Sequence, residues 1–126
     1  LKDELLPLAD RRRRLSVALA AMWRIYSGPT LAAWMELVIA ARTDATLRKQ
    51  VAAVERAFFA HAQAAFVELF GGDGMSPARA AAFTRMLLST FDGLALHHVL
   101  VPADDPAPVL AELERTFTAV LQELHR

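Results

Sequence analysis

The sequence contains no cysteine, and its charges cancel. Without cysteine there are no disulfides, no thiol nucleophiles and no zinc or iron–sulfur sites built on thiolates. The 14 basic and 14 acidic side chains argue against an isolated nucleic-acid-binding domain, which would normally be basic. No apolar run reaches the roughly 18–20 residues that a membrane-spanning helix needs. We therefore expect a cytoplasmic, single-domain protein that holds no cofactor or metal and does not bind a membrane.

What the sequence does contain favours helices. About one residue in five is alanine, the best helix former, and there are only 5 glycines. Apolar residues recur at intervals of three and four, and no segment has the alternation of a strand. Glycine and proline separate these segments, as at Gly28-Pro29. The sequence predicts an all-α bundle, orthogonal or antiparallel, with five helices at about 8–26, 29–42, 44–70, 77–100 and 107–125.

The motifs of common helical enzymes and metal proteins are missing. No glutamate is followed three residues later by histidine, and no HExxH, GxSxG or P-loop pattern occurs. His97 and His98 are adjacent, so they point about 100° apart on a helix and are poorly placed to chelate one metal. His61 lies on an apolar helix face, where it is either a core residue or a polar contact inside a ligand cavity.

A run of four arginines, Arg11 to Arg14, also allows two interpretations. Basic runs contact nucleic acids in many proteins. Four consecutive residues cover all sides of a helix, however, so they cannot form one stripe facing a groove. Acidic residues also lie close by, among them Asp10. We therefore favour a solvated helix start, or contacts to an upstream domain, over direct contact with DNA.

The predicted fourth and fifth helices carry more apolar surface than one small domain needs. The segment 77–100 is apolar almost all round. The last segment repeats apolar residues at steps of three and four, from Leu110 through Phe117 to Leu124, like a coiled-coil seam of two heptads. Aromatic and methionine side chains also gather on the first three predicted helices. These side chains either pack in the core or line an apolar cavity that contains a polar group.

Several segments together resemble the regulatory domain of TetR/AcrR-family transcriptional repressors. The resemblance extends over essentially the whole chain. The segments that carry it are Tyr26-Ser27-Gly28-Pro29, Ala33-Trp34-Met35-Glu36-Leu37, Ala40-Ala41-Arg42-Thr43-Asp44, Leu47-Arg48 and Phe91-Asp92-Gly93-Leu94-Ala95-Leu96.

This resemblance implies an effector cavity, a homodimer whose last two helices form a four-helix interface, and an N-terminal helix-turn-helix domain that binds operator DNA. Because the chain begins with Leu1 and not methionine, we interpret residues 1–126 as the effector-binding and dimerisation domain alone. Operator DNA would then be a partner only through the missing domain. Nothing in the sequence matches the metal-assisted tetracycline site of the family's namesake.

The resemblance and the apolar faces together give candidate site residues. We expect a mainly apolar or aromatic effector, because the candidates offer few polar groups and no paired charge. The candidate cavity residues are Met22, Trp23, Tyr26, Trp34, Val38, Phe58, His61, Ala62, Phe91 and His98. The candidate dimer residues are Leu88, Leu110, Leu113, Phe117, Val120 and Leu124.

Two alternatives to a repressor's sensor domain remain at this point. The first is a structural or adaptor bundle with no small-molecule site. The second is a small helical enzyme that uses His61 or His98 as a general base. We expect no enzyme, because the sequence places no acid or nucleophile convincingly beside either histidine.

Overall fold

The computed structural model describes residues 11–71 and 75–124. Within these ranges it contains five α-helices, one π-helical turn and no strand, which confirms the predicted all-α fold. The predicted start of the first helix at residue 8 lies outside the described residues, as do 72–74 and His125. The elements are α2 (Arg11–Tyr26), α3 (Pro29–Ala41), α4 (Ala45–Phe66), η1 (Val67–Gly71), α5 (Pro77–Leu100) and α6 (Ala107–Leu124).

The helix boundaries follow from local capping chemistry. The carboxylate of Asp44 accepts a hydrogen bond of 3.0 Å from the backbone N–H of Leu47 and so caps α4. The hydroxyl of Ser76 accepts one of 3.2 Å from the N–H of Arg79 at the start of α5. Proline follows in the first turn of α5, where its missing N–H is tolerated. Such signals lie within a few residues of one another, so the sequence predicts them well.

The end of α4 differs from the prediction of one continuous helix to residue 70. The α-helix stops at Phe66 and continues as the wider turn η1. Leu69 and Phe70 in this turn are only 6% and 5% exposed. The change of helical pitch therefore accompanies the burial of two large side chains at the end of a long helix.

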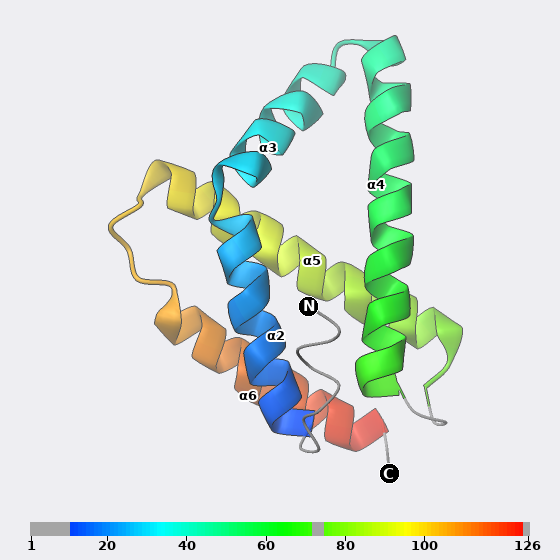
Figure 1. Cartoon of the computed structure of the whole chain (residues 1–126), viewed down its shortest axis with the longest axis vertical. Helices are drawn as coiled ribbons and strands as arrows, with labels where there is room; N and C mark the ends of the chain where they lie inside the picture. Colours follow the sequence, from blue (N-terminus) through cyan, green and yellow to red (C-terminus); the bar gives the residue numbers. More distant parts are fainter. Residues whose placement is uncertain (1–10, 72–74, 125–126) are drawn as a thin grey trace.

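The helices form a base and a projecting arm (Figure 1). In the base, α2 contacts α6 and α5. The arm leaves the base at the end of α2, runs along α3, turns, and returns along α4 to contact α5. We define the α3–α4 arm as α3 together with residues 45–58 of α4.

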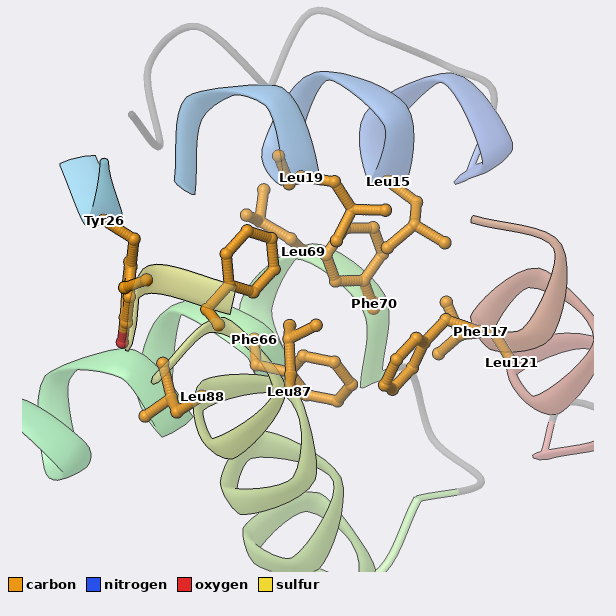
Figure 2. Close-up of a cluster of buried hydrophobic side chains, with 13 residues drawn as sticks. Leu15, Leu19, Tyr26, Phe66, Leu69, Phe70, Leu87, Leu88, Phe117 and Leu121 are labelled. Atoms are coloured by element: carbon orange, nitrogen blue, oxygen red, sulfur yellow. The ribbon is translucent and has the colours of Figure 1, made fainter. Parts of the chain in front are cut away.

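The hydrophobic core occupies the base. Leu15 on α2 and Phe91 on α5 are 1% and 0% exposed. Figure 2 shows side chains from α2, the end of α4 and η1, α5 and α6 converging on this cluster. Its members are Leu15, Ala18, Leu19, Tyr26, Phe66, Leu69, Phe70, Leu87, Leu88, Phe91, Ala95, Phe117 and Leu121.

The α3–α4 arm keeps much of its apolar surface exposed. In α3 only Ala41 is buried, although the helix is apolar at most positions. The exposed large apolar residues of the arm are Leu37, Val38, Ile39, Val54 and Phe58, each between 45% and 59% exposed. None of the described helices combines the length and hydropathy needed to cross a membrane.

Candidate functional site

A pocket of about 300 Å³ lies where the arm meets the base. We call it the first pocket. Helices α2, α3, α4 and α5 all contribute to its wall, so any ligand in it would touch four helices at once. Its volume is at the lower end of the range for small-molecule sites. The lining residues are Ile25, Tyr26, Thr30, Leu31, Trp34, Val54, Glu55, Phe58, Leu88 and Asp92.

Aromatic and aliphatic side chains share the apolar wall of this pocket. Tyr26 is 6% exposed, and its ring lies 5.4 Å from the ring of Phe91, a core residue. Trp34 is half-buried, whereas Phe58 is 47% exposed. The pocket therefore extends from the core at Tyr26 to the solvent at Phe58.

Two carboxylates, Glu55 and Asp92, also line the first pocket. Arg85 donates from Nη1 to Glu55 Oε1 at 3.0 Å, and its guanidinium carbon lies 4.1 Å from the centre of the Phe59 ring. Asp92 has no ion-pair partner among the residues described. An ion pair between α4 and α5 thus stands at the edge of this pocket, formed by residues outside the candidate set.

The acids influence one another electrostatically. Partial desolvation raises the pKa of Asp92, the negative charge of Glu55 raises it further, and Arg85 opposes both effects. Burial raises the pKa of Tyr26, and the charges of Asp92 and Glu55 add to that shift while Arg85 lowers it. Both results place two carboxylates and one guanidinium within electrostatic reach of the pocket. The arrangement disfavours further negative charge and favours a cation.

A second pocket, also of about 300 Å³, lies beside the end of α5. In it His97 Nε2 is 2.8 Å from Asp104 Oδ2, and the ring of Trp23 meets the ring of His98 edge-on at 5.3 Å. The Nδ1 atom of His98 is buried and has no hydrogen-bond partner in the described part of the chain. The lining residues are Trp23, Leu94, His97, His98, Asp104, Asp105, Pro106 and Val109. No group of three or more metal-ligating side chains occurs in the described part of the chain.

The ten candidate cavity residues are distributed over several environments. Three of them line the first pocket, namely Tyr26, Trp34 and Phe58. Two line the second, Trp23 and His98. Phe91 lies in the core beneath Tyr26, and Met22 and Ala62 pack partly buried against that core.

Val38 and His61 are exposed and line neither pocket. For His61 the reason is that α4 has two apolar stripes. The stripe containing Phe59 and Phe66 packs against the core, whereas the other stripe lines the first pocket at Val54 and Phe58 and is exposed at His61.

The candidate dimer residues are largely used within one chain. Leu88 and Phe117 are each 5% exposed, and Leu110 and Leu113 pack partly buried against the core. Val120 is half-buried, and the side chain of Leu124 lies outside the described residues. Their part in a dimer stays a prediction. The exposed large apolar side chains of α5 and α6 are Met86, Leu96, Val99, Leu100 and Val109.

Three residues of the first pocket region were missed by sequence reasoning, namely Glu55, Arg85 and Asp92. No motif marks them, and the two partners of the ion pair are 30 residues apart. One signal was present: Arg85, Leu88 and Asp92 are spaced i, i+3, i+7 and therefore share one face of α5. Charged residues on the same face as a buried leucine mark the boundary between core and solvent.

The comparisons with known proteins bear on the same elements. Residues 27–125 match the family described as BetI-type transcriptional repressor, C-terminal. This range contains α3 to α6 and so most of the first pocket. No curated protein and no solved structure matches the chain. The chain belongs to the family of C-terminal regulatory domains of BetI-type repressors, within the TetR-family regulators that its sequence resembles.

Proposed function

We propose that this domain senses a small organic cation with an apolar or aromatic body, and that the bound cation controls operator binding. In this proposal the first pocket holds the effector. A helix-turn-helix domain outside this chain contacts DNA, as the repressor family implies. The observation that carries the effector class is the pair of carboxylates, Glu55 and Asp92, in a pocket otherwise lined by aliphatic and aromatic side chains and one threonine.

The charges and rings favour a cation over a neutral or anionic ligand. Glu55 is paired with Arg85, which leaves the charge of Asp92 without an ion-pair partner among the described residues. A cation near Asp92 would be attracted to that carboxylate and to the faces of Tyr26 and Trp34. An anion would meet two like charges. The effector should therefore carry one positive group attached to an apolar body.

Contacts of α2 provide a route from the pocket to the DNA-binding part. Tyr26 at the end of α2 lines the first pocket. Near the other end, Arg14 donates to the carbonyl oxygen of Leu69 in η1 at 3.4 Å, and Arg12 lies 3.6 Å from Glu114 of α6. Suppose that α3 and α4 can adopt two positions and that α2 moves with them. A ligand that binds one position more tightly than the other then shifts the population of α2 toward the matching position.

The binding experiment uses a charged probe and its neutral isostere. Trp23→Phe leaves Trp34 as the one tryptophan, since the chain has 2. We expect benzyltrimethylammonium to change the Trp34 fluorescence saturably, and neopentylbenzene and phenylacetate to bind more weakly. Asp92→Asn should weaken binding of the cation by up to about fivefold, the upper end for a solvent-exposed charge pair.

Two outcomes of this titration would count against the proposal. Equal affinity for the cation and the neutral isostere would show that the pocket selects apolar shape alone. No binding of any probe would favour the adaptor bundle without a small-molecule site. Glu36→Gln is the matched control, because this exposed carboxylate on α3 does not line the pocket.

We also propose that the domain is a homodimer through α5 and α6. Leu96, Val99 and Leu100 share one face of α5 and are 53%, 57% and 72% exposed, which supports an apolar contact with a second copy. Val99→Arg should therefore give a folded monomer, measured by light scattering at micromolar concentration. Val38→Arg on the arm is the control and should leave the assembly unchanged. A monomeric wild-type domain would contradict the proposal.

A further inference from the structure

We propose that Arg85 is a built-in competitor of the effector, a cation of the protein itself that holds Glu55 until the ligand displaces it. This inference rests on the proposed function, because it requires a cationic ligand in the first pocket. It adds a regulatory role for a residue that does not line the pocket.

The contacts of Arg85 place it at the edge of the first pocket. Its Nη1 atom binds Glu55 Oε1 at 3.0 Å, and Glu55 lines the pocket. Its guanidinium also lies over the ring of Phe59, with 4.1 Å between the guanidinium carbon and the ring centre. A carboxylate and an aromatic face are the same two features that the pocket offers a ligand cation. The guanidinium of Arg85 thus makes the two kinds of contact, with a carboxylate and with an aromatic ring, that the proposed effector would make.

The ion pair between Arg85 and Glu55 is weak enough for a ligand to break it. The side chains of Arg85 and Glu55 are 47% and 38% exposed. Ion pairs in such positions are weak because water competes for both charges. Arg85 can therefore leave Glu55 for solvent when another cation arrives, without unfolding of α4 or α5.

The charge of Arg85 also reaches the other acid of the site. Arg85 and Asp92 lie on one face of α5, at a spacing of seven residues, with Leu88 of the pocket wall between them. While Arg85 remains paired, an incoming cation meets its like charge as well as the two carboxylates. Removal of the Arg85 charge should therefore strengthen binding of a cation.

Displacement of Arg85 would alter the contact between two helices. The Glu55–Arg85 pair joins α4 to α5 across 30 residues of sequence. Helix α4 continues into η1, where the carbonyl oxygen of Leu69 accepts the hydrogen bond from Arg14 of α2. If ligand binding breaks the Glu55–Arg85 pair, α4 loses a contact with α5. A resulting movement of α4 could reach α2 through η1 and the Arg14–Leu69 hydrogen bond.

Titration of benzyltrimethylammonium into matched variants tests the competition. All variants carry Trp23→Phe, so that Trp34 reports binding. We expect Arg85→Gln to bind the cation about two- to fivefold more tightly than the parent, as loss of an exposed like charge allows. Arg85→Lys should bind like the parent. Arg79→Gln is the control on the same helix, because Arg79 lies over Phe83 at 5.7 Å and not at the pocket.

A second pair of variants separates displacement from simple repulsion. If the ligand competes with Arg85 for Glu55, the gain from Arg85→Gln must shrink when Glu55→Gln is present. An unchanged gain in that background would overturn the displacement and leave only like-charge repulsion. Thermal melting of each variant identifies any that fail to fold.

The outcomes distinguish this inference from the function on which it rests. Binding of the parent with equal or weaker binding of Arg85→Gln overturns the role of Arg85 alone. Binding only after Arg85→Gln supports the competition in its strongest form. Absence of binding by the parent and all variants overturns both the cationic effector and the competitor.

Discussion

The base and the α3–α4 arm are built from similar apolar residues, yet the base buries many of them and the arm buries few. Phe91 in the base is 0% exposed, whereas Phe58 on the arm is 47% exposed. Apolar content alone therefore does not locate the core of this domain. Such exposed apolar surface is typical of sites that bind a ligand or another protein. The first pocket lies where this surface meets the core.

The two regions also differ in their polar groups. Thr84 is the buried polar residue of the base, and its hydroxyl donates to the carbonyl oxygen of Ala80 at 2.8 Å. At the junction with the arm, Glu55, Arg85 and Asp92 bring charge next to aromatic rings. The Thr84 hydroxyl is satisfied within α5, although His98 Nδ1 and Thr118 Oγ1 are buried with no hydrogen-bond partner among the described residues. The buried polar groups of the base are thus neutral side chains, whereas the junction holds charged ones at the edge of a pocket.

The largest effect should come from truncating the same residue type in each region. Phe91→Ala removes a fully buried ring and should lower the free energy of unfolding by about 3–5 kcal/mol, because it leaves a cavity in the core. Phe58→Ala should lower it by much less, since this ring is half in solvent already. Urea denaturation of both variants measures the contrast. Equal losses would show that the arm is as tightly packed as the base.

A smaller effect should distinguish the helix caps of the two regions. Ser76→Ala and Asp44→Ala each remove a side-chain acceptor for a backbone N–H, a loss of typically about 1 kcal/mol. Ser76 begins α5, which contributes Leu87, Leu88, Phe91 and Ala95 to the core, whereas Asp44 begins α4 in the arm. We expect Ser76→Ala to lower the global unfolding midpoint. Asp44→Ala should mainly speed hydrogen exchange in the first turns of α4.

These cap variants have a clear contrary outcome. If Asp44→Ala lowered the global midpoint as much as Ser76→Ala, the arm and the base would unfold as one cooperative unit. Thr43→Ala is the control for the arm, because it changes the neighbouring exposed residue and leaves the cap intact.

The smallest effect should be on the pH dependence of stability. The pKa of Asp92 is raised in the folded protein above its ordinary value of 3.8, mainly by desolvation. The unfolded chain therefore loses this proton at lower pH, and Asp92 lowers stability as pH rises through the interval between the two values. Asp92→Asn should remove that slope and melt slightly higher at neutral pH. Melting curves from acidic to neutral pH measure it, with Glu36→Gln as the control.

A lower melting temperature of Asp92→Asn at neutral pH would reverse the interpretation. It would mean that the ionised carboxylate stabilises the fold through a contact that outweighs its desolvation. Asp92 would then be a structural residue of the junction rather than a charge available to a ligand.

The amino-acid sequence alone specified the helices and the starts of α3, α4, α5 and α6. Capping by Asp44 and Ser76 depends on groups three residues apart, and apolar periodicity depends on groups three or four apart. Because every α-helix has the same hydrogen-bond geometry, these patterns can be interpreted without knowledge of the fold. The resemblance to TetR-family regulatory domains came from the same kind of local pattern and is confirmed.

Only the tertiary structure decided which apolar face is buried and which charges meet. On α4, Phe58 and Phe59 are neighbours in sequence, yet Phe59 packs against the core while Phe58 is exposed at the pocket. Phe117 belongs to the periodic apolar seam of α6, and its burial within one chain could not be predicted from that periodicity. Contact between Glu55 and Arg85 depends on how α4 and α5 cross. Burial and pairing are properties of two segments at once, so the periodicity of either segment cannot specify them.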